Sequence, residues 1–318
     1  MMPTAAPTDM AWVPGGSFLM GSDEFYPEER PVRETSVDGF WIDAHPVTVA
    51  EFRRFVKATG HVTVAERTPA SADYPDADPR LLVPGSLVFR PTRGPVDLRD
   101  FRNWWAYVPG ANWQRPEGPR SEVYTRARHP VVHVAYEDAA AYAAWAGKAL
   151  PTEVEWERAA RGGLAGKRFA WGDEFAPAGR MMANTWQGEF PWQNLRTDGY
   201  VGTSPVGAFP PNGHGLHDVT GNVWEWTCDR FEREPSPTPC CAPGEAGAQI
   251  PRHVIKGGSH LCAPNYCLRY RPAARQGEAV DTSTGHIGFR CVVRSASGTA
   301  PDAPDRRTAR APSIGGGG

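Results

Sequence analysis

Apolar side chains recur at helical spacing in the stretch that follows Thr48. Phe52, Phe55 and Val56 fall on one stripe of a helix, and Gly60 supplies a stop. This pattern predicts an amphipathic helix from about residue 48 to residue 60, with the stripe facing the core.

Two further helices are expected at about 135–147 and within 151–163. The first has acidic residues in its first turn and a glycine–lysine end, an arrangement that the helix dipole favours. In the second, Pro151 lies near the first turn, Thr152 can cap the backbone, and Trp156 begins the buried face. No helix longer than two turns is expected after this stretch.

The remaining pattern is typical of short strands and turns. Aromatic and β-branched residues broken by glycine predict short strands within 11–50. Segment 61–128 is rich in proline and glycine and is expected to be a long ordered loop. Short aromatic strands and glycine turns are expected through the C-terminal half, and HIGFRCVVR at 286–294 predicts a closing strand.

Apolar content sets the expected limits of the folded part. Residues 1–9 are expected to be a flexible N-terminus, and residues 295–318, which have almost no apolar side chains, a disordered tail. Because no repeat or linker divides the chain between them, residues 10–294 are expected to form a single domain.

Composition favours a packed domain with little regular structure. The 318 residues include 34 glycines and 32 prolines, which interrupt helices, and 12 tryptophans, which disordered chains usually lack. A formal net charge of −2 argues against a nucleic-acid partner, which would require a basic surface. No run approaches the ~20 apolar residues of a membrane span, and the first residues resemble no secretory signal. A cytoplasmic protein without membrane contact is therefore expected.

The cysteines lie in the last third of the chain: Cys228, Cys240, Cys241, Cys262, Cys267 and Cys291. Cys262 and Cys267 are separated by four residues of an irregular segment that follows a double glycine, so the two sulfurs can meet. Four interpretations of the pair remain open on residue types alone. They are a disulfide or redox pair, a two-thiolate Cu(I) site, a zinc site that adds His260 and another cysteine, and a pair of inert thiols.

The other cysteines lie outside this loop. Cys240 and Cys241 are adjacent and are expected in a surface loop. Cys228 and Cys291 flank strand-like segments and are expected to be buried as small apolar side chains.

Six segments carry a longer signature. They are GGSFLMGS (15–22), HPVVHVAYEDAAAYAAWAGKALPTEVEWERAARGG (129–163), ANTWQGEFP (183–191), FPPNGHGLHDVTGNVWEWT (209–227), KGGSHLCAPNYCLRYRPAAR (256–275) and GHIGFR (285–290). Together and in this order they resemble the formylglycine-generating enzymes, or sulfatase-modifying factors, of bacterial type. Most of these segments are shared by the wider superfamily, whereas the loop with two cysteines distinguishes the formylglycine-generating branch.

The resemblance implies a fold and a reaction. The fold is an α/β, C-type-lectin-like fold with little regular secondary structure. The reaction is the oxidation of the cysteine in a sulfatase Cys-x-Pro-x-Arg motif to Cα-formylglycine, with O2 as co-substrate and an external thiol as reductant. The implied partner is an unfolded or nascent sulfatase polypeptide, and the implied enzyme is a monomer.

The resemblance also assigns roles around the two-cysteine loop. It implies Cu(I) held by Cys262 and Cys267, with Ser259 as the nearby active-site serine. It places Trp224, Tyr266 and His286 in the substrate pocket. On residue types alone, Ser259 could equally be a turn residue after two glycines, and the two aromatic residues could be core packing.

Two structural calcium sites are implied by the same resemblance. The first would use Asn184, Thr185, Asp198 and Tyr200, and the second Asp218, Val219, Gly221 and Val223. Oxygen ligands from irregular loops suit a hard cation with flexible coordination. Both aspartates are also ordinary turn residues by sequence.

The chain departs from the family pattern at several positions. Ala263 and Pro264 replace residues that many members have in the loop, and His286 lies where many place an asparagine. These departures leave the cysteine pair intact and affect the fit of the substrate. Ala143 and Pro272 occupy positions where secretory members have cysteines, so Cys291 is expected to be unpaired.

The alternative interpretation is a superfamily member with another role. A lectin-fold binding module without catalysis is one form of it. An iron-dependent sulfoxide synthase is the other, although that class uses a histidine triad from an additional helical domain. Anaerobic radical chemistry is disfavoured because the chain has no CxxxCxxC motif.

Overall fold

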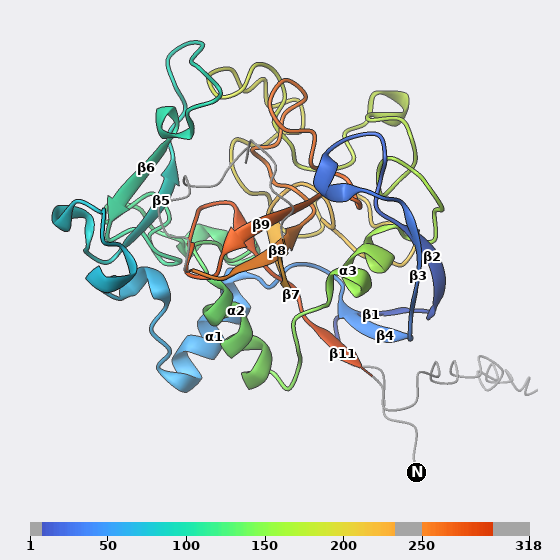
Figure 1. The fold of residues 1–318 in the computed structure, drawn as a ribbon, viewed down its shortest axis with the longest axis horizontal. Helices are drawn as coiled ribbons and strands as arrows, with labels where there is room; N and C mark the ends of the chain where they lie inside the picture. The colour runs from blue at the N-terminus through green and yellow to red at the C-terminus, as the bar shows by residue number, and fades with distance from the viewer. Residues whose placement is uncertain (1–7, 233–249, 295–318) are drawn as a thin grey trace, which may run out of the picture.

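The computed structural model describes residues 8–232 and 250–294 (Figure 1). The predicted flexible N-terminus lies largely outside the described residues, and the predicted tail at 295–318 lies entirely outside them, as do Cys240 and Cys241. The α-helices of the described part are α1 (Val49–Thr59), α2 (Tyr136–Trp145) and α3 (Glu153–Ala160).

Short strands and 3-10 helices supply the other regular structure. The strands are β1 (Met10–Val13), β2 (Gly16–Met20), β3 (Arg33–Val37), β4 (Phe40–Asp43), β5 (Gly85–Phe89), β6 (Trp105–Pro109), β7 (Trp224–Arg230), β8 (Arg252–Lys256), β9 (Arg275–Ala279), β10 (Ile287–Gly288) and β11 (Val292–Arg294). The 3-10 helices are η1 (Pro27–Glu29), η2 (Val64–Glu66), η3 (Ser71–Asp73), η4 (Pro79–Leu81), η5 (Phe101–Asn103), η6 (Tyr124–Arg126) and η7 (Pro177–Gly179). Irregular segments connect them, as the glycine and proline content predicts.

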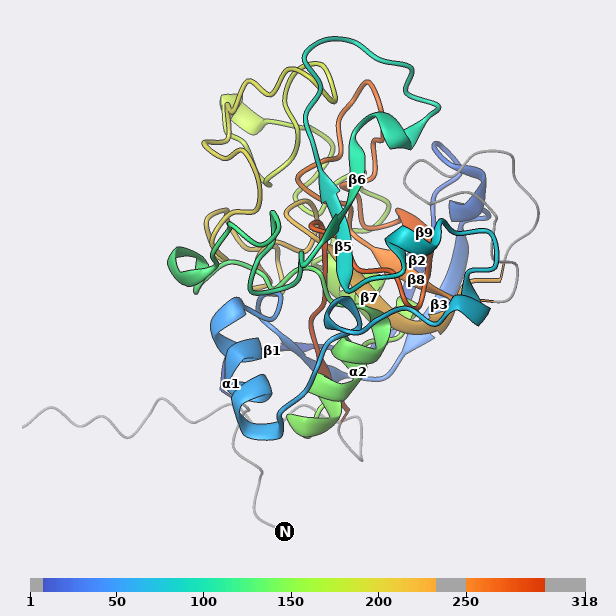
Figure 2. The ribbon, with the colours of Figure 1, turned by 90° about the vertical axis from the view of Figure 1, so that its left-hand side faces the viewer.

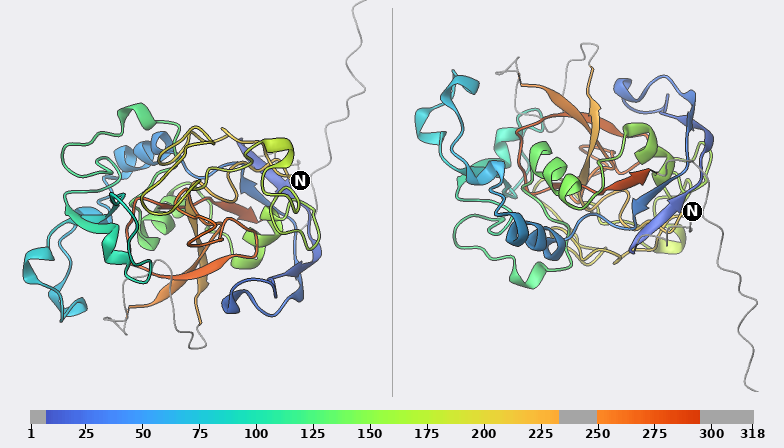
Figure 3. Two further views of the ribbon diagram at one scale, coloured as in Figure 1. Left: turned by 90° about the horizontal axis from the view of Figure 1, so that it is seen from above. Right: turned by 90° about the horizontal axis from the view of Figure 1, so that it is seen from below.

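The described strands form one four-stranded sheet and three smaller ones. The order in the largest sheet is β10-β7-β8-β9, with β10 parallel to β7 and the other pairs antiparallel. The order β1-β4-β11 brings both ends of the described chain into one antiparallel sheet. The pairs β2–β3 and β5–β6 lie on opposite sides of the largest sheet (Figures 1 and 3).

Helix α1 forms where the sequence predicts it because both of its ends are capped. Thr48 and Glu51 make a reciprocal capping box, in which the Thr48 N–H donates to the Glu51 carboxylate at 2.8 Å. Gly60 ends the helix with a left-handed φ of 72°. Phe52 and Phe55 are buried and pack against α2, which lies beside α1 in Figure 2.

The predictions for α2 and α3 are also confirmed. Thr152 is the N-cap of α3, and its hydroxyl accepts a hydrogen bond from the Glu155 N–H at 3.1 Å. Pro151 precedes this cap and is not part of the helix. Trp156 is buried, and its indole N–H donates to Glu225 at 2.7 Å. None of the described helices is long and apolar enough to cross a membrane.

The prediction of a loop throughout 61–128 is wrong. The segment contains the antiparallel pair β5–β6, in which Leu87 lies opposite Tyr107 and Phe89 opposite Trp105. A hairpin is recognised in a sequence by a tight turn between its strands. Here a long connection separates the two strands, so the local pattern gives no such signal.

The predicted closing strand at 286–294 is divided between two sheets. β10 pairs in parallel with β7, whereas β11 pairs antiparallel with β4. The chain crosses from one sheet to the other at Arg290, whose guanidinium is fully buried and bonds to Glu225 at 2.7 Å. The buried Arg290–Glu225 pair thus divides a segment that the apolar pattern predicts as one continuous strand.

The two cysteines outside the loop that the structure describes differ in burial. Cys291 is fully buried as predicted and forms no disulfide, and burial raises the pKa of its thiol well above the usual value. Cys228 is only half-buried, so its predicted burial is wrong. It lies in the second half of β7, close to the end of that strand, where the cover of the sheet is incomplete.

Buried ion pairs connect α3 to the largest sheet. Lys256, at the end of β8, has no exposed side-chain surface, and its ammonium lies 2.9 Å from Glu157 and 3.4 Å from Glu153. Arg161 bonds to Glu157 at 2.6 Å, and Arg275 of β9 bonds to Glu153 at 2.7 Å. Burial opposes the ionisation of Glu157, but the charges of Lys256 and Arg161 prevail and hold its pKa below the usual value.

We expect Glu157→Ala to destabilise the protein strongly, because it leaves the buried Lys256 ammonium without its closest carboxylate. Loss of one partner of a buried ion pair costs about 3–5 kcal/mol. The measurement is the free energy of unfolding in urea. Asp78→Ala is the control: Asp78 pairs with Arg80, whose side chain is 89% exposed, and such surface pairs contribute at most about 1 kcal/mol. Equal losses in the two variants would contradict the structural role of the buried pair.

Candidate active site

The two-cysteine loop begins with a close approach of its own backbone. Gly257 and Gly258 both have left-handed conformations, with φ of 90° and 69°. A Cβ atom on Gly258 would lie 2.6 Å from the carbonyl oxygen of Arg269. Only glycine fits here, because the two ends of the loop touch through their backbones.

The structure brings Cys262 and Cys267 together. Their Sγ atoms lie 3.0 Å apart, beyond the ~2.05 Å of a disulfide bond, and both residues are 1% exposed. The Cys267 N–H donates to the carbonyl of Ala263 at 2.9 Å, which forms the turn that returns the chain to the first sulfur. The pair is therefore present as two adjacent thiols inside the core.

Ser259 lies at the start of this turn and is fully buried. Its backbone N–H donates to the Cys262 sulfur at 3.4 Å, and its hydroxyl accepts from the Leu261 N–H at 3.2 Å. Ser259 is thus adjacent to the sulfur pair through its backbone, while its side chain stabilises the turn.

His260 makes its hydrogen bonds away from the sulfur pair. Its Nδ1 bonds to the carbonyl oxygen of Asn222 at 2.8 Å, and burial lowers the pKa of its ring to about 4, so the ring is neutral at pH 7. Among residues 8–232 and 250–294, no group of three or more histidine, cysteine, aspartate or glutamate side chains is arranged to hold a metal ion. The four-ligand zinc alternative therefore has no assembled ligand set in this part of the chain.

An aromatic wall stands beside the sulfur pair. The ring of Tyr266, the residue before Cys267, stacks on Phe190 with centroids 4.5 Å apart and meets the edge of Trp104 at 5.3 Å. Trp224 is fully buried in the same hydrophobic cluster as the two cysteines. Large rings of this kind exclude water from the sulfurs.

His286 approaches the site from the residue before β10. Its Nδ1 bonds to the Thr284 hydroxyl at 2.8 Å, and its ring lies 4.9 Å from that of Trp105. Its carbonyl accepts the backbone N–H of Trp224 at 2.9 Å, which joins the two predicted pocket residues directly. The structure therefore joins Trp224 to His286 through their backbones, whereas Tyr266 lies in the loop itself, directly before Cys267.

Residues near the N-terminus hold the far end of the loop, which the sequence analysis did not find. Glu29 and Arg271 form a bidentate ion pair at 2.6 and 2.8 Å, and both side chains are buried. The guanidinium of Arg271 also lies 3.6 Å from the ring centroid of Phe25. The hydroxyl of Tyr26 accepts the Leu268 N–H at 3.1 Å, one residue after the second cysteine.

The four residues predicted for the first calcium site lie together. Asp198 accepts the backbone N–H groups of Thr185 at 3.2 Å and Tyr200 at 2.9 Å, next to the buried Asn184. The Gln187 amide donates to the Asp198 carboxylate at 2.8 Å and also to the Thr185 carbonyl. The Asp198 carboxylate and the Thr185 carbonyl, two of the oxygens expected to hold the cation, thus accept from the same Gln187 nitrogen and lie close together. Oxygen donors of this kind are those that a hard cation prefers.

The second predicted calcium loop contains an unsatisfied acceptor. One carboxylate oxygen of Asp218 accepts the Gly207 N–H at 2.8 Å, whereas Oδ1 is buried with no hydrogen-bond partner in the described residues. Burial raises the pKa of this carboxyl. Val219, Gly221 and Val223 follow in the same loop, and their carbonyls are the other expected ligands. A buried acceptor without a partner fits a bound cation.

The sequence is similar to known proteins over almost its whole length. Residues 2–295 match the family described as sulfatase-modifying factor enzyme 1-like domain. The chain is 56% identical to the formylglycine-generating enzyme of Mycobacterium tuberculosis, over 92% of this chain and 99% of that protein. It is 50% identical to the Streptomyces coelicolor enzyme of that name, over 88% and 87%. It is also 39% identical to a mouse protein named inactive C-alpha-formylglycine-generating enzyme 2, over 89% and 85%.

Solved structures have the same fold. The structure of PvdO from Pseudomonas aeruginosa superposes with a TM-score of 0.59 at 25% identity, covering 92% of this chain and 98% of that one. Variable protein 1 of Treponema denticola, at 17% identity and a TM-score of 0.52, agrees in fold alone, over 90% and 95%. The predicted α/β, C-type-lectin-like fold with little regular structure is confirmed. By its match over residues 2–295 and these relatives, the chain belongs to the sulfatase-modifying factor family, with bacterial formylglycine-generating enzymes among its relatives.

Proposed function

We propose that this protein converts the cysteine of a sulfatase Cys-x-Pro-x-Arg motif to Cα-formylglycine. The observation that supports the proposal most directly is the buried Cys262–Cys267 pair, with sulfurs 3.0 Å apart, in a chain with close relatives named for this product. The partner would be an unfolded or nascent sulfatase, because the motif cysteine must enter a buried site in an extended segment. We expect a cytoplasmic monomer.

Two buried thiols form a donor set that fits Cu(I), a soft ion that binds thiolates and accepts few ligands. Cys262 and Cys267 would hold the ion. When bound, the ion would supply a soft centre with open coordination positions for thiolate and O2 chemistry. Ser259 contributes a backbone N–H directed at the Cys262 sulfur, which stabilises the negative charge of a thiolate there.

The pocket residues would orient the substrate and keep water out. The stacked rings of Tyr266 and Phe190 would form one wall of the pocket, and Trp224, buried in the same apolar cluster as the cysteines, would form another part of it. His286 is held in one orientation by Thr284, so its ring can position the substrate backbone. A dry, shaped pocket prevents water from reaching a reactive sulfur before the product forms.

The overall reaction balances with one O2 and two reducing thiols. The β-carbon of the substrate cysteine becomes an aldehyde, its sulfur leaves as hydrogen sulfide, the two thiols become a disulfide, and one water forms. O2 accepts four electrons, two from the substrate cysteine and two from the thiols. The proposal therefore requires both an oxidant and an external thiol reductant.

The competing proposal is a binding module of the same fold without this activity. The observation that favours it is the 39% identical mouse protein, which is named inactive although it is similar over most of its length. The sulfoxide synthase alternative has no supporting observation within the described residues, where no three-ligand histidine cluster is found.

We expect the protein to bind one Cu(I), and Cys262→Ser or Cys267→Ser to abolish tight binding, because one thiolate cannot replace a two-sulfur site. Competition against a Cu(I) chelator, followed by elemental analysis, measures this binding. Cys228→Ser is the matched control, because Cys228 lies outside the loop, near the C-terminal end of β7. This variant should retain the copper. Zinc in the purified protein, or copper retained by both loop variants, would refute the assignment.

We expect a peptide with Cys-x-Pro-x-Arg to gain an aldehyde when it is incubated with copper-loaded protein, O2 and a thiol. Mass spectrometry measures the replacement of the thiol by a carbonyl, and a hydrazide probe captures the product. The reaction should stop without O2 and in either loop-cysteine variant. Product formation under strict anaerobiosis would overturn the mechanism, and no product from any such peptide would favour the binding module.

We expect chelation of calcium to lower the melting temperature, because an ion that binds only the folded state stabilises it by mass action. At one hundred times the dissociation constant this amounts to about 2.7 kcal/mol. Calorimetry of Asp198→Ala and Asp218→Ala should show lower melting temperatures and a smaller further effect of chelator. Asp78→Ala, at an exposed pair, is the control and should respond to chelator as the unmodified protein does. If the chelator lowered the melting temperature equally in all of these proteins, Asp198 and Asp218 would not be calcium ligands and would act only in turns.

A further inference from the structure

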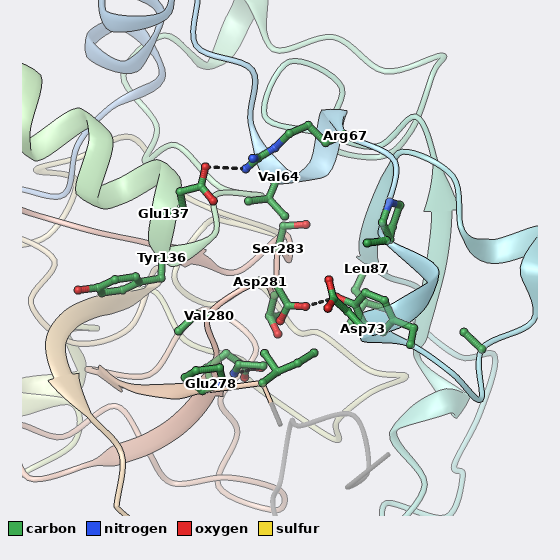
Figure 4. Close-up of a pocket in the computed structure, with 18 of the residues that line it drawn as sticks. Val64, Arg67, Asp73, Leu87, Tyr136, Glu137, Glu278, Val280, Asp281 and Ser283 are labelled. Atoms are coloured by element: carbon green, nitrogen blue, oxygen red, sulfur yellow. Dashed lines mark hydrogen bonds and ion pairs between the residues drawn. The ribbon is translucent and has the colours of Figure 1, made fainter. Parts of the chain in front are cut away.

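A cavity lies at the opposite end of the largest sheet from the two-cysteine loop. This cavity has a volume of about 750 Å³ (Figure 4). It is lined by the end of β7, the start of β8, the end of β9, the start of α2 and the η3–η4 segment. We refer to it as the β9 cavity. Trp224 belongs to the candidate active site and Arg230 lines the β9 cavity, so the length of β7 separates them. Six steps along a strand span about 20 Å.

The lining of the β9 cavity is mainly aliphatic and aromatic. Leu82, Leu87, Tyr107, Tyr136 and Val280 contribute apolar surface from separate elements. Figure 4 shows the labelled side chains of Leu87, Tyr136 and Val280 around an open space. Concave apolar surface with a few polar groups is typical of a binding site.

Several of the charged groups around the cavity have partners within the described residues. Arg67 and Glu137 pair at 2.9 Å at its rim, and the Tyr74 hydroxyl bonds to Asp281. Glu278 is 2% exposed, and burial raises its pKa to about 7, so much of it is uncharged at neutral pH. Arg230 and Arg252 also line the cavity, so its apolar surface is bordered by charged groups.

One face of the β5–β6 pair continues from this cavity to the candidate active site. Leu87 and Tyr107 lie opposite each other and line the cavity. Two residues along, on the same face, Phe89 and Trp105 lie opposite each other. Trp105 is the ring that contacts His286, so about 7 Å of strand separates the cavity lining from a predicted substrate residue.

A second segment makes the same connection. Ser283 lines the cavity, and its carbonyl accepts the hydroxyl of Ser86 at 2.6 Å. Three residues later in this segment His286 reaches the candidate active site. Two stretches of chain therefore connect the lining of the cavity to His286, so the cavity lies next to a predicted substrate residue.

We propose that the β9 cavity binds an apolar segment of the sulfatase polypeptide, next to the motif whose cysteine enters the site. This inference rests on the proposed function. An unfolded chain exposes apolar residues that its folded state buries, and an extended stretch of about six residues covers the ~20 Å between the two sites. The cavity thereby favours unfolded over folded substrate, since a folded sulfatase would hide both the motif and its apolar neighbours.

The test compares peptides that share one Cys-x-Pro-x-Arg core. The minimal peptide contains this core alone. The extended peptides carry an added apolar segment on the N-terminal or the C-terminal side. The serine peptides carry the same segment with serine in place of each apolar residue. We expect the apolar extension on one side to lower KM about tenfold with kcat unchanged, as burial of one aliphatic side chain would. The serine version should behave as the minimal peptide does.

Val280→Asp places a charge in the apolar lining, and Val201→Asp is the matched control at a position that is 63% exposed and outside the cavity. We expect Val280→Asp to raise KM for the extended peptide to that of the minimal peptide, with the minimal peptide unaffected. No benefit from an apolar extension on either side, or an equal effect of Val280→Asp on all peptides, would overturn the inference.

A binding measurement separates this inference from the proposed reaction. Fluorescence anisotropy with a labelled extended peptide, in which serine replaces the motif cysteine, needs neither copper nor turnover. Binding that is weakened about tenfold by Val280→Asp and unchanged by Val201→Asp would support the cavity even if no aldehyde forms. Equal binding by the extended and minimal peptides would refute the cavity even if the reaction proceeds.

Discussion

The ammonium group of Lys256 has no contact with water, and the carboxylates of Glu153 and Glu157 lie on either side of it. These glutamates are one turn apart on α3, and Lys256 is the residue before the double glycine of the two-cysteine loop. The position of α3 therefore fixes where the loop begins. Because Arg275 bonds to Glu153 as well, the strand that follows the loop is fixed by the same helix. A site made of irregular backbone is rigid here because its two ends are held by buried charge.

The loop is also held from a segment far away in the sequence. Glu29 and Arg271 are 242 residues apart, yet they form a buried bidentate pair, and Tyr26 bonds to the backbone directly after the second cysteine. The aromatic wall on the other side comes from Trp104 and Phe190. The site is thus assembled from every third of the chain, which explains why a fold with little regular structure can still position two sulfurs.

Local signals in the sequence predict what local physics controls. Thr48 and Gly60 mark the ends of α1 because capping depends on neighbouring residues, and the spacing of Cys262 and Cys267 predicts their meeting because a short turn joins them. The β5–β6 pairing, the Glu29 contact and the β9 cavity depend on residues that are distant in the chain, and no periodicity encodes such contacts. The family resemblance predicts the fold and proposes the site residues, whereas the ion pairs that hold the loop are seen only in the structure.

The sheet order β1-β4-β11 has a consequence for how the protein is made. Its last strand ends at residue 294, so this sheet cannot be completed until nearly all of the described chain has left the ribosome. The Glu29–Arg271 pair likewise joins parts of the chain synthesised on the order of tens of seconds apart. Ile287 and Phe289, which belong to the same apolar cluster as the two loop cysteines, are also synthesised after them, so the cluster around the thiols is completed late. An ion that needs the enclosed pair would therefore bind late in the maturation of the protein.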